Sequence, residues 1–379
     1  MSKPNFAPLK LFITGPTYIR QDVKEAALLP EFGHRDTEND LRCVPIRENL
    51  RKLAGCGDDF EPILCLGSGS TAMETSVRSL VADGETILNV SVGAFGDMYY
   101  NIAVSNGKKA ENLKFDYGQA IDLNVLEDKL RELKPEVVSF THNETSTGVV
   151  NDVKAVCEVI CKHGAMPLVD GVSIFGGAPL DLSESGAAMY STATQKSLGL
   201  PAGFGIGFVS KEAEEKAAKV TNKGHHHDIT KHLDKARKNQ TLTTPNTCLV
   251  NQMWYQLDRI VNEEGIENRF ARHAAMRGQV EQWVAGIDGY EMFAAEGYRS
   301  PTLSTVRCPK GVTLAQLKNG VKEGLRDEGY LMDPGYGKMN AALEEAGRGL
   351  VFRVGHMGDI TPEMLAEYLD KLEVELKKL

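Results

Sequence analysis

Apolar and polar residues alternate along the middle of the chain in a way that predicts strands joined by helices. Between about residue 60 and residue 220, short apolar runs are followed by stretches with apolar residues three and four positions apart. Short apolar runs are typical of buried strands, and the second spacing places apolar side chains on one face of a helix. Elements alternating in this order favour an open α/β sheet whose strands are mostly parallel.

The strands expected in this sheet are short and rich in apolar residues. They lie at Pro62 to Leu66, Thr86 to Val92, Val137 to Thr141, Met166 to Asp170, Met189 to Thr194 and Gly205 to Val209. Helices are expected between them, for example at Thr71 to Val81, Leu123 to Leu133 and Val153 to His163.

The pattern changes after Asn246, where a helical spacing of apolar residues runs on through Val284. This long helix would bridge two lobes. Beyond it, strands at Ser304 to Cys308 and Gly349 to Val354 and helices at Leu314 to Leu325 and Pro362 to Lys378 predict a smaller α+β domain. We therefore expect an N-terminal arm at 1–20, a large domain at 21–255, an interdomain helix at 256–285 and a small domain at 286–379.

Composition narrows the class of partner. The 379 residues include 43 Lys and Arg against 52 Asp and Glu, a net charge of −9, which argues against nucleic acid or an anionic membrane surface and favours small molecules. No run approaches the roughly 18 apolar residues of a membrane helix, and Met1 to Lys10 lacks the apolar core of a signal peptide. We expect a cytoplasmic enzyme whose 7 cysteines are reduced and form no metal site.

The turn from Leu66 to Thr71 has the composition of a phosphate site. Its sequence, Leu-Gly-Ser-Gly-Ser-Thr, joins a predicted strand to a predicted helix. Glycines let the backbone approach an anion, and hydroxyls and free N–H groups at a helix start donate hydrogen bonds to it. A strand-to-helix turn without a ligand has a similar sequence, and a nucleotide site is an alternative, although no P-loop lysine follows and Ala72 stands where a third glycine would complete a dinucleotide motif.

Two further residues extend this picture. Asp170 ends a predicted strand at the sheet edge where ligands usually bind, although such a residue often only caps a turn. Lys196 follows another strand and enters a loop of small residues and glycines. A lysine that forms an imine must extend to the aldehyde, have small neighbours and lose its proton readily. Taken alone, such a lysine could also be a solvated surface residue.

Taken together, these features resemble the class V aminotransferases, which are fold type I enzymes dependent on pyridoxal phosphate (PLP), and in particular the alanine–glyoxylate and serine–pyruvate aminotransferases. The matching motifs span nearly the whole chain. They are Gly15-Pro16-Thr17, Gly33-His34-Arg35, the turn at 66–71, the loop His142 to Gly148, Asp170, Thr-Gln-Lys-Ser-Leu at 194–198 with Pro-Ala-Gly at 201–203, and Phe352 to Gly358.

The resemblance implies a role for each matching residue. Lys196 would hold the cofactor as a Schiff base and act as the catalytic base, and Asp170 would bind the pyridine nitrogen. Arg353 would grip the substrate carboxylate through its fork of N–H groups, with Gly15 beside the substrate. The other cofactor contacts are expected from Ser68, Gly69, Ser70 and Gln195 at the phosphate, Phe95 stacked on the ring where relatives often have Trp, and Thr145 at the ring hydroxyl.

The segment Thr241 to Asn246 resembles the one that in this family reaches the neighbouring subunit's phosphate. An obligate homodimer with shared active sites is therefore expected, with either Thr243 or Thr244 making the contact. His34 and Arg35 are expected either to reach a substrate's distal acid or to serve the dimer seam. The run His225 to His227 is interpreted as a solvated turn.

The function expected from this resemblance is transfer of an amino group from an alanine-like or serine-like donor to a glyoxylate-like or pyruvate-like 2-oxo acid, by a ping-pong mechanism. One alternative is a class V lyase or cysteine desulfurase. Those enzymes usually have His before the lysine, where Gln195 stands here, and a reactive cysteine in a late mobile loop, whereas Cys308 is expected at the end of a strand. Phosphoserine or an aminophosphonate is an alternative donor.

Overall fold

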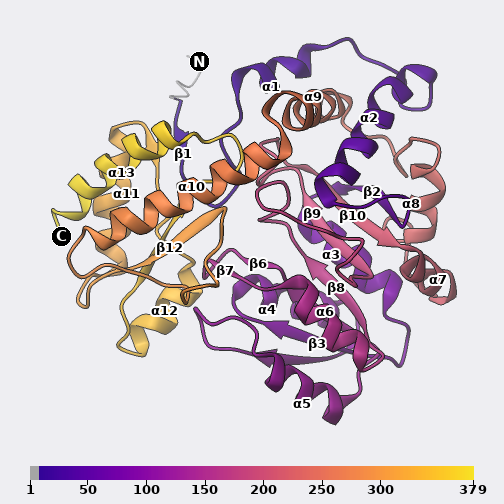
Figure 1. Cartoon of the computed structure of the whole chain (residues 1–379), viewed down its shortest axis with the longest axis horizontal. Helices are drawn as coiled ribbons and strands as arrows, with labels where there is room; N and C mark the ends of the chain where they lie inside the picture. The colour runs from indigo at the N-terminus through magenta and orange to yellow at the C-terminus, as the bar shows by residue number, and fades with distance from the viewer. Residues whose placement is uncertain (1–7) are drawn as a thin grey trace, which may run out of the picture.

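The computed structural model describes residues 8–379 and has a seven-stranded sheet in its larger part (Figure 1). The strand order is β2-β10-β9-β8-β5-β3-β4. The pairs from β9 through β4 are parallel, whereas β10 runs antiparallel to both β2 and β9. The sheet is mostly parallel and lies among helices, as the sequence predicts.

The six strands predicted for this sheet, and the three helices predicted between them, lie within a few residues of their expected positions. The strands of the sheet are β2 (Phe60–Gly67), β3 (Thr86–Ser91), β4 (Lys109–Lys114), β5 (Val137–Thr141), β8 (Met166–Asp170), β9 (Met189–Ala193) and β10 (Gly203–Ser210). The helices of this part are α1 (Gln21–Glu25), a 3-10 turn (Ala26–Leu28), α2 (Thr37–Ala54), α3 (Gly69–Leu80), α4 (Ala94–Ser105), α5 (Leu123–Leu133), α6 (Val153–Lys162), α7 (Lys211–Lys219), α8 (Ile229–Ala236) and α9 (Thr247–Asp258). Two short strands, β6 (Asn143–Glu144) and β7 (Val149–Val150), form a separate hairpin.

Strand β4 was not predicted because it does not have the composition of a buried strand. It lies at the edge of the sheet and pairs only with β3. Lys109, Glu111 and Lys114 are exposed along it, and with Asn112 they make four of its six residues polar. Charged side chains are a common feature of edge strands, where they hinder pairing with another chain.

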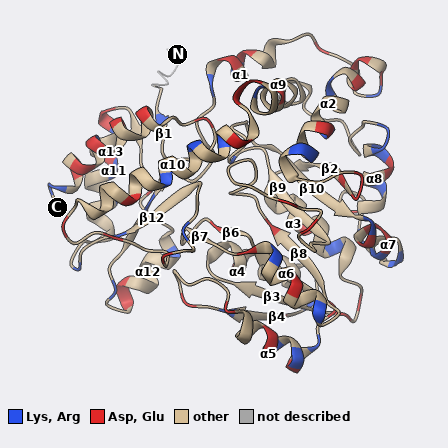
Figure 2. Cartoon of the chain, viewed as in Figure 1, with Lys and Arg blue, Asp and Glu red and all other residues tan. Residues whose placement is uncertain are grey.

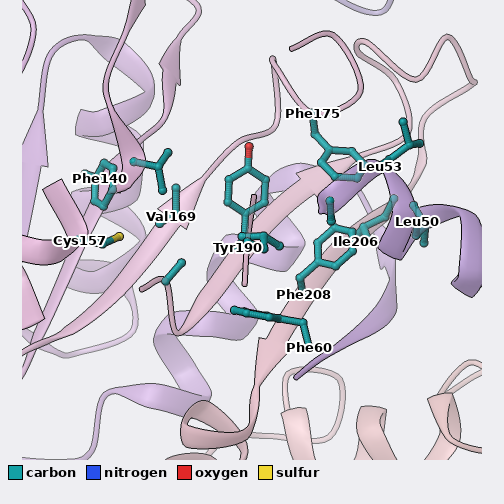
Figure 3. Close-up of a cluster of buried hydrophobic side chains, with 14 of the residues drawn as sticks. Leu50, Leu53, Phe60, Phe140, Cys157, Val169, Phe175, Tyr190, Ile206 and Phe208 are labelled. Carbon is teal, nitrogen blue, oxygen red and sulfur yellow. The ribbon is translucent and has the colours of Figure 1, made fainter. Parts of the chain in front are cut away.

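The interior strands rest on a core of aromatic and branched side chains. Figure 3 shows Tyr190 of β9 beside Phe175, with Ile206 and Phe208 of β10 nearby. The ring centroids of Phe175 and Tyr190 are 6.2 Å apart, and those of Phe175 and Phe208 are 5.2 Å apart. Close packing of this kind resists deformation, so the loops that follow β8 and β9 stand on a rigid base.

Charged residues lie mostly on the outer helices and loops, and the inner strands β8, β9 and β10 are largely without them (Figure 2). Helix α5 illustrates the pattern, because its Leu126 and Leu130 are buried while Asp128 and Arg131 are exposed. Within residues 8–379, no helix combines the length and the apolar character needed to cross a bilayer.

The C-terminal elements form a second group around the three-stranded sheet β11-β12-β14. They are α10 (Ile266–Ala285), β11 (Glu291–Met292), β12 (Leu303–Arg307), a π-helical segment (Gln316–Val321), α11 (Lys322–Asp327), β13 (Tyr330–Leu331), α12 (Gly337–Glu345), β14 (Val351–Gly355) and α13 (Pro362–Leu376). The N-terminal strand β1 (Lys10–Leu11) pairs with β13 in parallel, and the ring of Phe12 stacks on that of Tyr368 at 4.0 Å. This pairing brings Thr14 and Gly15 beside β14, where Gly355 donates its N–H to the Phe12 carbonyl at 2.9 Å.

The prediction of one long helix from Asn246 to Val284 was wrong. Helix α9 ends at Asp258, a π-helical turn covers Arg259–Glu264, and α10 begins at Ile266 after Gly265. Gly265 has a φ of +81°, a conformation outside the helical region that glycine adopts without steric cost. Likewise, the expected helix at Leu314 to Leu325 divides into the π-helical segment and α11.

The apolar cores follow the two groups of elements. One large cluster extends from Val23 to Ala294, and another combines Phe12 with residues from Met276 to Leu376. The three boundaries between the four segments expected from the sequence remain predictions, and residues 1–7 of the expected N-terminal arm lie outside the described residues.

Candidate active site

The turn between β2 and α3 presents hydroxyls and backbone N–H groups at the start of a helix. The hydroxyls of Ser68 and Ser70 are 3.0 Å apart, and Gly69 opens the helix. A Cβ on Gly69 would lie 2.4 Å from Cγ2 of Val172, and a Cβ on Gly205 would lie 2.4 Å from the Ser68 carbonyl oxygen. Gly69 therefore lets the start of α3 approach the end of β8, and Gly205 lets it approach β10. Free N–H groups at such a helix start can bind an anion.

Asp170 ends β8 with its side chain buried. Its Oδ1 accepts the Val172 N–H at 2.9 Å, and this is the one hydrogen bond of the carboxylate among the described residues. Burial raises the pKa of Asp170 to about 7, and the nearby Lys196 amine opposes that rise. A cationic N–H at Oδ2 would relieve the cost of the buried charge.

Lys196 follows β9, and its amine donates to the backbone carbonyl of Thr14. Gly15, with a φ of +115°, makes room for it: a Cβ there would lie 2.6 Å from both Cδ and Nζ of Lys196. Burial and, to a lesser extent, the positive charge of Arg353 lower the pKa of Lys196 to about 8, against the opposing effects of Asp170 and Asp333. A substantial fraction of this amine is therefore neutral, and hence nucleophilic, close to neutral pH.

The loop that carries Lys196 is held from beneath by buried side chains. Arg269 of α10, which is 0% exposed, donates to the Ser197 carbonyl at 2.6 Å, and Gln256 of α9 donates to the Leu198 carbonyl at 2.7 Å. Asp359 accepts from both Gln256 and Arg269, at 2.8 and 2.9 Å. These residues were not predicted from the sequence, because the contacts that give them a role join segments far apart in the chain.

Phe95 is positioned by Glu144 at the start of α4. The buried Glu144 carboxylate accepts the N–H groups of Phe95 at 3.0 Å and Gly96 at 2.9 Å. It also accepts the Ser146 hydroxyl at 2.7 Å. Burial raises the pKa of Glu144, but these donors occupy both of its oxygens, so the carboxylate anchors the backbone beside Phe95. The Phe95 ring lies 6.3 Å from that of Tyr336, measured between centroids.

Arg353 lies on β14 with 8% of its surface exposed. It donates from Nη1 to the Thr145 backbone carbonyl at 3.0 Å, so Thr145 is adjacent to it through the main chain. Nη2 forms an ion pair with Asp333 at 2.9 Å, and the buried Nε has no hydrogen-bond partner. The sequence analysis missed Asp333, whose only local signal is the Pro-Gly turn that follows it.

Other predicted residues are not joined to this cluster by a described contact. The Gln195 side-chain oxygen is buried without a partner. Thr243 lines a cavity of about 310 Å³ together with Thr71 and Glu74, and Thr244 is exposed. Their roles as cofactor ligands remain predictions.

Arg35 holds the segment that contains these threonines. It donates to the Gln240 side chain at 2.7 Å and to the carbonyls of Thr241 and Leu242 at 3.1 and 3.2 Å. His34, beside it, is half-buried. These contacts engage the Arg35 guanidinium within its own chain, and both roles expected for His34 and Arg35 remain predictions.

The run of three histidines is only partly a solvated turn. His225 and His226 are exposed, but His227 is half-buried and its Nδ1 lies 3.0 Å from the Thr75 hydroxyl. Among residues 8–379, no group of three or more His, Cys, Asp or Glu side chains is arranged to hold a metal ion.

Comparison with known proteins places this geometry in context. The sequence profile of the family Aminotransferase class-V matches residues 31–323. An uncharacterized aminotransferase of Methanocaldococcus jannaschii is 31% identical over 97% of this chain and 93% of its own length. The 2-aminoethylphosphonate–pyruvate transaminase of Phocaeicola vulgatus is 27% identical over 98% of this chain and 99% of its own. The crystal structure of alanine–glyoxylate aminotransferase from Nostoc sp. superposes with a TM-score of 0.90 at 25% identity, covering 99% of this chain and 97% of that one.

Proposed function

The chain belongs to the class V aminotransferase family and is an aminotransferase, and on this basis we propose that it is a PLP enzyme that moves the amino group of a small amino acid to a small 2-oxo acid. The donors meant are alanine-like or serine-like, and the acceptors glyoxylate-like or pyruvate-like. One observation carries the proposal: the Lys196 amine lies against Thr14 and within electrostatic reach of both Asp170 and Arg353.

The residues of the site fit PLP in chemistry and in space. At the start of α3, Gly69 packs closely against Val172, and the Ser68 and Ser70 hydroxyls lie beside it as donors for the phosphate. The one described hydrogen bond of the Asp170 carboxylate is at Oδ1, which leaves Oδ2 for the pyridine N–H. The proposed remaining contacts are Lys196 at the aldehyde, Phe95 on the ring face, Gln195 at the phosphate and Thr145 at the ring hydroxyl.

The chain's own residues would then divide the work of transamination. PLP, when bound, supplies a ring that withdraws electrons from the substrate α-carbon. Asp170 keeps the ring nitrogen protonated by pairing with its N–H. Arg353 holds the substrate carboxylate, and Lys196 takes the α-proton as a neutral amine and delivers it to the neighbouring carbon. The donor's 2-oxo acid leaves before the acceptor binds, which predicts ping-pong kinetics.

A substrate panel tests this function. We expect alanine or serine with glyoxylate or pyruvate to give the highest kcat/KM among donors that also include aspartate, phosphoserine and 2-aminoethylphosphonate, with parallel lines in double-reciprocal plots. Lys196→Ala should reduce the rate by at least about a thousandfold, whereas Lys211→Ala, on the exposed start of α7, should leave it unchanged. A clear preference for the aminophosphonate would overturn the proposed donor, and no transamination with any pair would overturn the function.

The burial of Cys308 argues against the desulfurase alternative. This thiol is 2% exposed, and burial raises its pKa to about 12. A cysteine that attacks sulfur must be an accessible thiolate. We therefore expect no sulfide release from cysteine above the level of the Cys308→Ala variant.

We also propose a homodimer in the cytoplasm. Apolar side chains are exposed on both sides of Arg35 in the chain, with Leu28 85% and Leu41 70% exposed. Arg35 itself holds the segment of Thr243 and Thr244. Burial of these leucines against a second copy would remove an unfavourable apolar surface from water and bring that segment to the partner's active site.

A further inference from the structure

Asp333 is the only described partner of Arg353 that carries a negative charge, and it does not act on Arg353 alone. It is 7% exposed and lies in the loop between β13 and α12. Its Oδ2 accepts Nη2 of Arg353 at 2.9 Å and the Thr14 hydroxyl at 3.0 Å. Its Oδ1 accepts the Gly335 N–H at 3.0 Å and Nη2 of Arg353 at 3.1 Å. Both oxygens are thus occupied by protein donors.

Thr14 carries the connection from Asp333 to the reacting amine. The Thr14 hydroxyl and N–H point to Asp333, the latter at 3.4 Å, while its carbonyl accepts the Lys196 amine. The buried Asp333 carboxylate therefore links Thr14, which binds the Lys196 amine, to Arg353. The contacts between Thr14 and Asp333 join positions 319 residues apart in the chain, and that between Lys196 and Thr14 spans 182 residues, so no local sequence feature creates them.

Asp333 leaves one edge of Arg353 unused. Nη1 is fixed by the Thr145 carbonyl and Nη2 by Asp333, while the Nε–H is buried without an acceptor. A buried donor without a partner costs free energy, so the edge that includes Nε is favourable for an incoming carboxylate.

We propose that Asp333 is a positioning residue of this active site: it fixes the Arg353 guanidinium so that the Nε edge faces the substrate carboxylate, and it holds Thr14 so that the Thr14 carbonyl aims the Lys196 amine. The inference rests on the proposed function, because it takes Arg353 as the substrate-binding residue. Asp333 touches neither substrate nor cofactor in this assignment.

The pKa of Lys196 provides a second measurement of the role of Asp333, independent of KM. Arg353 lowers the pKa of the amine, whereas Asp170 and Asp333 raise it. Replacing Asp333 by an uncharged residue leaves Arg353 without its local counter-charge, so the pKa of Lys196 should fall. A residue with only a structural role would not move this value in a defined direction.

The variants Asp333→Asn and Asp333→Glu distinguish the effect of the negative charge of residue 333 from the effect of its position. Asn presents an N–H₂ group to donors on one side, so Arg353 loses its fixed position. We expect the KM for pyruvate or glyoxylate to rise at least tenfold, with a smaller change in kcat. Glu keeps the charge but displaces it by one methylene, so KM should rise while the Lys196 titration stays close to that of wild type. Asp327→Asn, at the exposed end of α11, is the matched control and should behave as wild type.

The Lys196 titration is measured on the apoenzyme by competitive acetylation, followed by mass spectrometry of the Lys196 peptide across a pH series. We expect a lower midpoint for Asp333→Asn than for wild type. If Asp333→Asn does not fold, the KM of Asp333→Glu decides the matter. If the wild-type enzyme is active and the folded Asp333 variants have the same KM and the same Lys196 midpoint as wild type, Asp333 has no positioning role. The proposed function would then remain intact. An inactive wild-type enzyme would instead overturn the proposed function, while the titration would still report on Asp333.

Discussion

At the scale of single residues, burial of the Asp170 carboxylate makes the stability of the protein depend on pH. The Asp170 carboxylate is 4% exposed, and its cationic partner in the proposed complex is the cofactor. Because burial raises its pKa from 3.8 to about 7, the folded protein binds more protons than the unfolded chain between these pH values. The stability of the apoenzyme therefore falls as pH rises through this window, by up to about 4 kcal/mol from this group.

Asp170→Asn should therefore stabilise the apoenzyme and abolish its activity. Asn fills the same space and keeps an oxygen for the Val172 N–H, but it carries no buried charge and cannot neutralise a protonated ring nitrogen. Urea denaturation at pH 8 should give a higher free energy of unfolding for the variant than for wild type, and the difference should vanish toward pH 4. A variant less stable than wild type at pH 8 would contradict this account of Asp170.

The pH dependence of cofactor attachment follows from the Lys196 amine. Only the neutral amine attacks an aldehyde, so the rate at which the apoenzyme incorporates PLP should rise with pH and level off above about 8, the lowered pKa of Lys196. Stopped-flow absorbance measures this rate, with Nα-acetyllysine as the reference for an ordinary amine near 10.5. A midpoint as high as that of the reference would show that burial and Arg353 do not act on Lys196 as described.

At the scale of elements, helices α9 and α10 support the loop of Lys196 through buried polar contacts. Arg269→Ala should destabilise the protein by about 3 to 5 kcal/mol, since it leaves Asp359 short of a partner and the Ser197 carbonyl unpaired. The exposed pair of Arg237 with Glu214 offers a control, for which Arg237→Ala should cost about 1 kcal/mol or less. Equal losses of stability in the two variants, measured in urea, would contradict the importance of the buried contacts.

Local sequence patterns predicted the elements that depend on local interactions. The strand before Asp170 and the helix after Ser68 are found at nearly their predicted positions, because apolar periodicity and a glycine turn determine both. The break at Gly265 was missed because glycine inside an apolar helical pattern is often tolerated, and only the tertiary structure decides whether it ends the helix.

Contacts between distant segments of the chain could not be predicted from local sequence patterns. The hydrogen bond from Thr14 to Asp333 joins residues 319 positions apart, and the Arg269 contact with Ser197 spans 72. Lys196 and Arg353 were identified by their motifs, but Asp333, Thr14 and Arg269 became visible only once the N-terminal strand was found to pair with β13 and the long helix was found to bend.

At the scale of the whole molecule, the proposed dimer would make each active site depend on the other chain. Leu41→Glu and Leu28→Glu place a charge on the exposed apolar residues that flank Arg35. We expect wild type to sediment at twice the mass of one chain and the variants to shift toward the monomer, with loss of PLP affinity because Thr243 and Thr244 no longer reach the partner. Val125→Glu, a similar change on α5 with 45% exposure, should leave both properties unchanged. A wild-type protein that sediments as a fully active monomer would rule out the shared site.

The central claim is that the amine of Lys196 bonds to the cofactor, and chemical trapping tests it most directly. The protein saturated with PLP is reduced with borohydride, digested and analysed by mass spectrometry. We predict that the yellow colour disappears and that the phosphopyridoxyl group is found on the peptide containing Lys196, with Lys196→Ala giving no labelled peptide. A label on another lysine, or a Lys196→Ala protein that still forms a reducible adduct and turns over normally, would contradict the account.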